Sequence, residues 1–333
     1  ILRSKFSLFC DLNQFRMKNN MLNKILLNKY SEFLTAVDIE IDGSRPWDLK
    51  VYNPDLYKSI LFKGSLGFGE SYIKGWFDCD RLDLFFEKIL SSGIYNEIGG
   101  IPSYFGKMKS KLRNLQSISR AFQVAEHHYD IGNDLFSLML DKTMMYTCGY
   151  WTKDVATLEE SQLAKLDLVA KKLDLKAGMK VLDIGCGWGG AAKHFANNYG
   201  VTVVGISISK EQIEYAKQNS DNMGVEFRLM DYRDLDEKFD AIYSIGMFEA
   251  VGYKNYEEFF EVVRSCLKEE GAFLLHTIGG NESTTTADPW VEKYIFPNGM
   301  MPSAEQIAKA SEGIFIFDDW HNIGPHYDKT LMC

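Results

Sequence analysis

The sequence has no apolar run long enough to cross a bilayer and no secretory pattern at its start. Its six cysteines are scattered, with neither a CxxC pair nor the spacing of a zinc site, which favours reduced thiols over a disulfide framework. A net charge of −9 argues against binding to nucleic acid and against bulk attraction to anionic lipid. These absences predict a soluble protein without a metal centre, whose contact with any membrane is local.

The overall composition is that of a globular protein: 46% of the 333 residues are hydrophobic, which is enough for two cores. A small α+β domain is predicted over residues 1–95. The alternation of apolar and polar residues at 37–44 predicts a strand. The stretches 54–64 and 80–93 are typical of amphipathic helices, the second capped by Asp80.

A glycine-rich stretch follows and predicts a linker over residues 96–120. Within 121–333, from residue 155 on, helical patterns alternate with short apolar strands, as in a doubly wound parallel sheet. The basic segments 3–29 and 107–120 are candidates for contact with lipid headgroups, or alternatively solvated surface and connector.

The motif "VLDIGCGWGG" places Gly185, Gly187 and Gly190 as G-x-G-x-x-G between a strand and a helix. A dinucleotide would require an acid at the end of the next strand, which instead ends at Ser207. Asp183, at the tip of the first strand, would repel a pyrophosphate but can hold an ammonium group. The loop therefore predicts S-adenosylmethionine as its ligand.

Further cofactor candidates follow the next two strands, at the edge of the sheet where such folds bind ligands. The positions are Ser207, Ile208 and Gln212 for the ribose, and Asp231, Tyr232 and Arg233 for the adenine.

Several motifs occur in the order found in one enzyme family. With "MMYTCGYW", "LLHTIGG" and "YIFPNG", the sequence resembles the cyclopropane-fatty-acyl-phospholipid synthases from about residue 30 to its end. The resemblance implies a Rossmann-like class I methyltransferase domain behind a small lipid-handling domain, often in a homodimer. It implies methyl transfer from S-adenosylmethionine to a cis double bond of a membrane phospholipid, with bicarbonate in the active site. The expected location is cytoplasmic, transiently at the inner membrane surface.

The same resemblance assigns roles to residues of this chain. It implies that Glu249 accepts a hydrogen bond from bicarbonate, beside His276, Tyr327 and the main chain at Cys148 and Ile278. Cys148 is not expected to be a nucleophile, because methyl transfer is direct. Positions that match family contacts to the cofactor are Tyr146 and Thr147, and candidates for the acyl channel are Tyr150, Trp151, Phe248 and Tyr294.

The resemblance has two departures, and other functions stay open. Ala250 stands where the family motif often has histidine, and the sequence stops at Cys333 short of the family's last helices, so we expect a truncated chain. One alternative is an acyl-chain methyltransferase that leaves a methyl-branched or hydroxylated product. Others are a lipid-binding relative without catalysis and, as the weakest, an NAD-dependent dehydrogenase.

Overall fold

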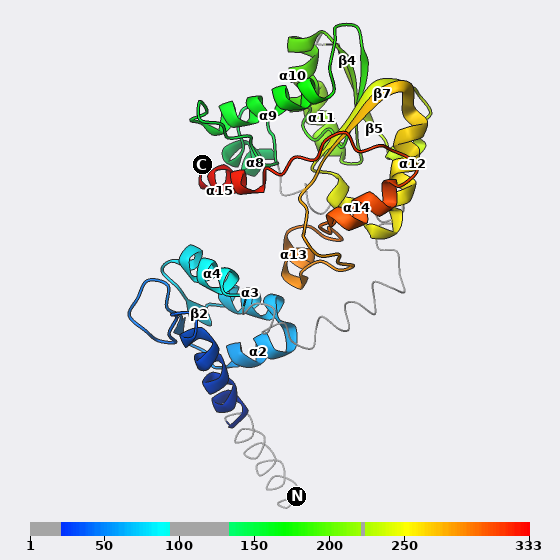
Figure 1. Ribbon diagram of the computed structural model, residues 1–333. Helices are drawn as coiled ribbons and strands as arrows, with labels where there is room; N and C mark the ends of the chain where they lie inside the picture. The colour runs from blue at the N-terminus through cyan, green and yellow to red at the C-terminus, as the bar shows by residue number, and fades with distance from the viewer. Residues whose placement is uncertain (1–20, 94–132, 221–223) are drawn as a thin grey trace, which may run out of the picture. The chain divides into compact units, whose positions relative to one another are not determined.

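The computed structural model describes residues 21–93, 133–220 and 224–333 (Figure 1). The chain divides into two compact units, and the described part of the first comprises 21–93 and 288–294. The expected domain boundaries, the linker and the basic segment 107–120 lie outside the described residues, as do residues 3–20. Among the described residues, no helix has both the length and the apolar character needed to span a membrane.

The first unit is a small α+β structure around one apolar core. Its core includes Ile39, Leu56, Phe77 and Phe85, all at most 4% exposed. The elements are a helix over 21–35, β1 (Lys50–Val51), α2 (Asp55–Lys63), α3 (Ser65–Ile73), the antiparallel β2 (Phe77–Asp78) and α4 (Leu82–Ser91).

Local signals predicted the ends of α2 but not every element of this unit. Helix α2 begins after Pro54, and Gly64 ends it with a φ of 57°. The strand predicted at 37–44 is wrong: Asp38 and Asp42 have φ values of 59° and 57°, and the segment forms only an isolated bridge. The cap predicted at Asp80 is also wrong, because Arg81 precedes α4 and Asp80 accepts from Lys50.

Helix α13 (Pro289–Tyr294) belongs to the first unit although it follows the last strand of the second in sequence. The Glu70 carboxylate accepts hydrogen bonds from Lys293 Nζ at 2.6 Å and from Lys63 Nζ at 2.9 Å. These donors, Lys293 first, lower the pKa of Glu70 to about 2. Lys293 therefore links α13 to α3, and Lys63 links α2 to the same carboxylate.

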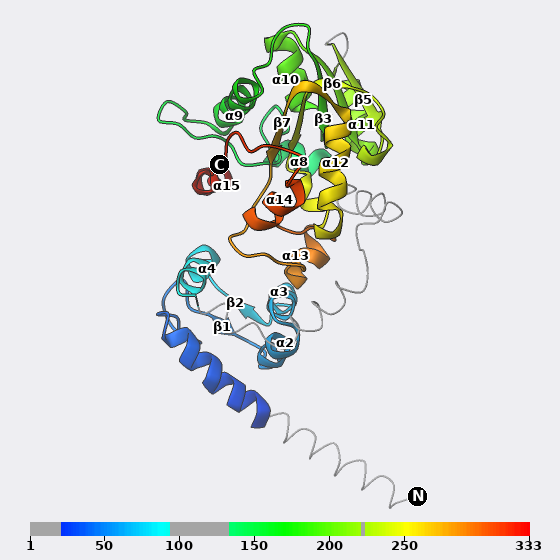
Figure 2. The same ribbon diagram turned by 45° about the vertical axis from the view of Figure 1, so that its right-hand side comes forward.

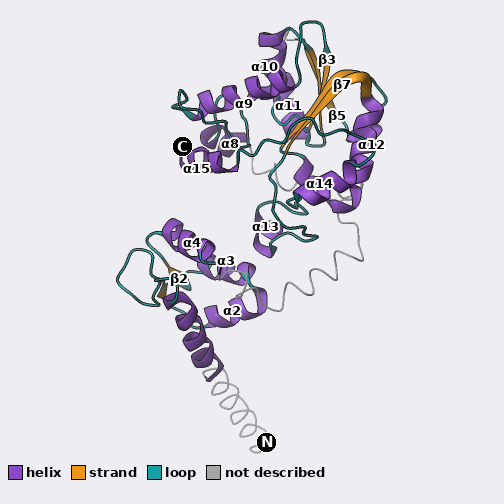
Figure 3. Cartoon of the chain, viewed as in Figure 1, coloured by secondary structure: helices purple, strands orange, loops and turns teal. Residues whose placement is uncertain are grey.

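The second unit contains a five-stranded parallel sheet in the order β5-β4-β3-β6-β7. Figure 3 shows the strands of this sheet in orange with helices around them. This confirms the predicted Rossmann-like fold. Its strands are β3 (Lys180–Ile184), β4 (Thr202–Ser207), β5 (Val225–Leu229), β6 (Phe239–Ile245) and β7 (Leu267–His276). Its described helices are α8 (Asn133–Met139), α9 (Leu158–Lys172), α10 (Gly190–Tyr199), α11 (Lys210–Gln218), α12 (Tyr256–Cys266), α14 (Ala304–Ser311) and α15 (Tyr327–Met332).

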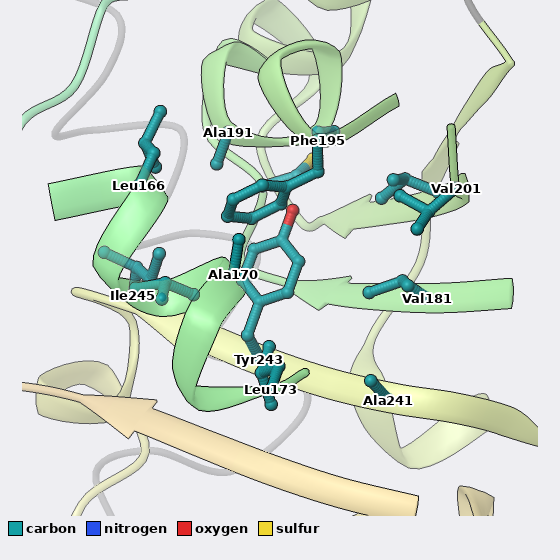
Figure 4. Close-up of a cluster of buried hydrophobic side chains, with 14 of the residues drawn as sticks. Leu166, Ala170, Leu173, Val181, Ala191, Phe195, Val201, Ala241, Tyr243 and Ile245 are labelled. Atoms are coloured by element: carbon teal, nitrogen blue, oxygen red, sulfur yellow. The ribbon is translucent and has the colours of Figure 1, made fainter. Parts of the chain in front are cut away.

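Alternate residues of these strands face two separate cores, as the pleat requires. On one face Val181, Tyr243 and Ile245 pack with residues of α9, α10 and α11 (Figure 4). On the other face Leu182 and Ile242 pack with residues of α12 and α14, which lie next to each other (Figure 2). With both faces covered, the sheet presents polar groups at the carboxyl ends of its strands.

Candidate active site

The glycine loop connects β3 to α10 and leaves open space beside its backbone. Gly185 and Gly187 have φ values of 88° and 53°, which favour glycine. The amides of Gly185 and Cys186 donate to Ile206 at 2.9 and 3.0 Å, which fixes the loop on β4. A Cβ on Gly187 would meet no described atom within 4 Å. The loop can therefore receive a ligand at Gly187.

Asp183 lies under this loop but faces the core. Its side chain is on the face of the sheet that packs against α10, and the residue is 2% exposed. The Tyr243 hydroxyl donates to its carboxylate at 2.9 Å. Burial raises the pKa of Asp183 to about 7, against the lowering effect of the Tyr243 hydrogen bond. The contact between Asp183 and the cofactor's ammonium group stays a prediction.

The ribose candidates Ser207 and Gln212 contact each other. Ser207 ends β4, and its hydroxyl donates to Gln212 Oε1 at 3.1 Å. Ser209 caps α11 and presents Gln212 in the first turn of that helix. Ile208 is half-buried between them. The structure thus places one hydroxyl and one amide at the end of β4, and their contact with a ribose stays a prediction.

The adenine candidates form an ion pair of their own at the end of β5. Asp231, 3% exposed, accepts from the Arg233 guanidinium at 3.1 Å, and Arg233 also donates to Glu258. Tyr232 is buried with its ring edge against Phe259 at 5.2 Å between centroids. Asp231 and Arg233 therefore stand at the sheet edge, whereas the Tyr232 ring belongs to the core.

Glu249 follows β6 on a 3-10 turn, Phe248–Ala250. Its Oε1 accepts the amide hydrogen of Ile278 at 2.6 Å, so the main chain at Ile278 binds Glu249 itself. Its Oε2 is buried and has no partner among the described residues. Burial raises the pKa of Glu249, while the donors at Ile278 and Thr277 partly lower it. The free oxygen of this carboxylate can accept a hydrogen bond from a ligand.

His276 is the last residue of β7 and pairs in register with Ile245 at the end of β6. Its carbonyl accepts from the Gly246 amide at 2.9 Å, which fixes the histidine beside the turn that carries Glu249. Its Nδ1 is buried and has no partner among the described residues. Burial, together with the charge of Lys165, lowers the pKa of His276 to about 4. The imidazole is therefore neutral at neutral pH, with one nitrogen able to donate.

Tyr327, the first residue of α15, lies beside the main chain of Cys148 and within the electrostatic field of Glu249. Burial first, then the charges of Cys148 and Glu249, raises the pKa of Tyr327 to about 12, so its phenol stays a donor. Burial also raises the pKa of the Cys148 thiol, which argues against a thiolate nucleophile. The structure thus brings together residues that are up to 179 positions apart, Cys148 and Tyr327.

Three hydrogen bonds fix α15 and the turn before it to the segment after Cys148. Thr330 Oγ1 accepts from the Gly149 amide at 3.1 Å and from the Trp151 indole at 3.0 Å. His326 Nδ1 accepts from the Trp151 amide at 2.9 Å. The sequence analysis missed Thr330 and His326, because no local pattern indicates a partner so far along the chain.

Tyr146 and Thr147, the matched cofactor positions, lie on the same segment. Tyr146 is 38% exposed, with its ring 5.5 Å from that of Phe136. Thr147 accepts from the Lys165 ammonium through its hydroxyl and from the Gln162 amide through its carbonyl, at 2.6 and 2.8 Å. Neither α9 residue was predicted. A lysine at a buried position of an amphipathic helix was the available signal.

The four acyl-channel candidates have different structural environments. Phe248 was predicted wrongly, because it is fully buried and stacks on Tyr256 at 4.3 Å in the α12 core. Tyr294 belongs to the first unit, where its hydroxyl donates to Glu70. Tyr150 stacks near His326, and Trp151 binds α15 as described. Tyr150 and Trp151 follow Cys148 closely in the chain. The group of Cys148, Glu249, His276 and Tyr327 is hereafter the anion cluster.

Two comparisons by sequence find relatives of one kind. The model of the mycolic acid cyclopropane synthetase family matches residues 116–333. The cyclopropane-fatty-acyl-phospholipid synthase of Escherichia coli K12 is 53% identical over 307 residues, which cover 91% of this chain and 79% of that protein. Cyclopropane mycolic acid synthase 1 of Mycobacterium tuberculosis is 38% identical over 228 residues, or 63% of this chain and 79% of that protein.

Solved structures agree with these relatives. The cyclopropane synthase MmaA2 from Mycobacterium tuberculosis superimposes with a TM-score of 0.59 at 34% identity, over 63% of this chain and 80% of its own. Mycolic acid cyclopropane synthase CmaA1, complexed with SAH and CTAB, gives a TM-score of 0.58 at 35% identity over the same shares. The fold, the glycine loop and these matches show an S-adenosylmethionine-dependent methyltransferase, and the chain belongs to the cyclopropane synthase family.

Proposed function

We propose that the chain transfers the methyl group of S-adenosylmethionine to a cis double bond of a phospholipid acyl chain and closes a cyclopropane ring. The Escherichia coli relative, which is 53% identical over 91% of this chain, is named a cyclopropane-fatty-acyl-phospholipid synthase. That name supports a phospholipid as the substrate. The observation that supports ring closure is the anion cluster. Glu249 Oε2 and His276 Nδ1 are both buried and both lack a partner among the described residues.

The reaction places three demands on the protein. The alkene electrons attack the sulfonium methyl, the carbon–sulfur bond breaks, and a carbocation forms on the acyl chain. The new methyl then loses a proton, and its carbon–hydrogen electron pair closes the ring. The site must therefore align a weak nucleophile, exclude water and accept one proton without alkylation of the protein.

The donor set of the anion cluster fits bicarbonate. Glu249 can accept the hydrogen of its hydroxyl, while neutral His276 and the Tyr327 phenol can donate to its oxygens. When bound, bicarbonate would supply the base for the methyl proton. The chain contributes by holding a neutral imidazole and an un-ionised phenol in place. The half-buried Tyr146 ring can stabilise a cation nearby without reacting with it.

The partner that follows from this chemistry is a bilayer containing cis-unsaturated phospholipids. Of the basic segments predicted to contact it, only residues 21–29 lie within the structure, on the helix over 21–35. A homodimer, as the family resemblance implies, is part of the same proposal and is tested by light scattering of the purified protein.

Mass spectrometry of the lipid product tests the proposal. Vesicles with cis-monounsaturated chains are incubated with the protein and methyl-labelled S-adenosylmethionine. We expect a gain of one labelled methylene and loss of the double bond. A labelled methyl on a chain that keeps an alkene or gains a hydroxyl would replace ring closure by simple methylation. An unlabelled lipid, with the cofactor bound in a calorimetric titration, would refute the enzymatic proposal for this chain.

Replacing Tyr327 by phenylalanine removes one predicted anion donor and leaves the ring. We expect turnover to fall about 100-fold, since a lost preorganised donor has effects of this order. Affinity for S-adenosylmethionine should stay the same. Tyr199→Phe is the matched control, because that hydroxyl donates to Asp167 at 2.8 Å away from the anion cluster. Equal turnover of Tyr327→Phe and the control would exclude Tyr327 from the reaction.

A further inference from the structure

Lys165 is a buried cation that the proposed reaction does not use. It lies in the middle of α9 and is 1% exposed. Its ammonium donates to Thr147 Oγ1 at 2.6 Å and to Gln162 Oε1 at 2.5 Å, and neither partner is charged. Among the described residues, no carboxylate forms an ion pair with it. Burial of an ammonium without an ion-paired carboxylate is costly, so a further negative charge nearby would stabilise its charged form.

The contacts of Lys165 lead to the anion cluster on two sides. With Gln162, which donates to the Thr147 carbonyl, Lys165 fixes both oxygens of Thr147. A Cβ on Gly246 would overlap the methyl group of Thr147, so the two residues are in close contact. The Gly246 amide in turn donates to the carbonyl of His276. Cys148 follows Thr147 in the chain, and the backbone of Cys148 lies beside Tyr327.

The described groups around Lys165 do not fully balance its charge. Asp141 is the carboxylate that acts on it, but Asp141 already accepts from the Thr143 amide, the Thr143 hydroxyl and the Met145 amide. The other titratable groups within its field are the Cys148 thiol and the imidazole of His276, both neutral at neutral pH. An anion bound in the cluster would supply the negative charge that Lys165 lacks.

We propose that Lys165 is the positioning residue of the anion cluster, where its ammonium fixes Thr147 and its charge balances an anion bound beside His276. The inference rests on the proposed function, in which that anion is bicarbonate. It explains why α9 carries a lysine at a position where its neighbours Leu166 and Val169 are apolar and buried.

The proposal makes the site sensitive to pH. Burial lowers the pKa of Lys165 to about 7, against the raising effects of Asp141 and Cys148. The ammonium form therefore predominates below that pH and is lost as the pH rises through it. A bound anion favours the charged form and shifts the pKa upward. Turnover should decline on the alkaline side, and higher bicarbonate should move the decline to higher pH.

The test uses Lys165→Met, which keeps the length of the side chain and removes the charge, and Lys171→Met on the exposed end of α9 as its control. The first readout needs no lipid: the melting temperature of the protein is measured in sodium bicarbonate and in sodium chloride of equal ionic strength. A ligand that binds the folded state raises the melting temperature. The second readout is turnover across pH, and the third is affinity for S-adenosylmethionine.

We expect wild type and Lys171→Met to gain stability in bicarbonate, and Lys165→Met to lose that gain. Turnover of Lys165→Met should fall about 100-fold without an alkaline decline, while its cofactor affinity stays within about threefold. A bicarbonate gain that persists in Lys165→Met would overturn the proposal, whatever its turnover. Loss of turnover with an unchanged alkaline decline would likewise reduce Lys165 to a packing role. If wild type binds bicarbonate but forms no ring, the proposed function fails and the melting test of Lys165 still decides.

Discussion

Glu249→Gln should reduce turnover about 1,000-fold or more while S-adenosylmethionine still binds, because it removes an acceptor that only the reacting site uses. The carboxylate receives the Ile278 amide on Oε1 and leaves the buried Oε2 for a ligand. Glutamine keeps the shape and one acceptor, but its amide nitrogen would meet either the Ile278 amide or the hydrogen of the bound anion. Two donors would then face each other in a buried site.

Stability should respond in the opposite direction. Burial raises the folded-state pKa of Glu249, so ionisation of this group opposes folding. The wild type therefore loses stability as the pH rises through that pKa, and Glu249→Gln should not lose it. If the variant is inactive yet at least as stable as wild type at neutral pH, Glu249 is retained for catalysis at a cost in stability.

The measurements are single-turnover ring formation, calorimetric titration with the cofactor and thermal unfolding at several pH values. Glu257→Gln, an exposed carboxylate in the first turn of α12, is the control and should behave as wild type in all three. Retained turnover in Glu249→Gln would remove it from the reaction. Loss of cofactor binding would move its role from the anion cluster to the cofactor site.

Gly190→Ala should destabilise the second unit by about 3 kcal/mol or more and abolish cofactor binding. A Cβ on Gly190 would overlap the carbonyl oxygen of Thr143, and neither backbone can yield cheaply. Gly190 begins α10 directly after the glycine loop, and Thr143 lies just before Tyr146 and Thr147. The added methyl group would therefore push apart two segments that are both predicted to contact the cofactor.

Gly178→Ala is the matched control, since the same methyl group is added in the same unit. Gly178 has a φ of 88° and open space around its Cβ position, so only the backbone conformation is strained. That strain costs about 1–2 kcal/mol and should leave cofactor affinity unchanged. Chemical denaturation and calorimetry separate the two effects. If both variants lost equal stability and both bound the cofactor, close packing of the loop on residue 143 would be unimportant.

Residues with local signals were predicted well. Pro54 and Gly64 were read as the ends of a helix because their own backbone preferences stop one. The apolar runs of the parallel sheet and the glycine loop were equally clear, since a strand buried on both faces must be apolar throughout. Glu249, His276, Cys148 and Tyr327 were named together only through the family resemblance. The structure brings them to one place, but their roles remain predictions.

Residues whose environment depends on distant partners were predicted poorly. Phe248 stands beside Glu249 in the sequence, yet it packs in the α12 core while the carboxylate lies at the sheet edge. The alternation at 37–44 has the period of a strand, but two aspartates in the left-handed conformation interrupt it. The roles of Lys165 and Thr330 were not predicted, because a hydrogen bond between residues far apart in the sequence produces no local sequence pattern.

The sequence by itself determined the fold class, the cofactor loop and the membership of a family. Periodicity and glycine placement are local patterns, and the family motifs are continuous stretches that can be matched directly. Only the tertiary structure decided which polar atoms lack partners among the described residues and that the charge of Lys165 acts on His276. Those properties arise when segments from β6, β7, α9 and α15 meet, and burial turns an ordinary glutamate, histidine and lysine into groups with shifted pKa values. Desolvation is a property of the packed site, and no single stretch of sequence contains it.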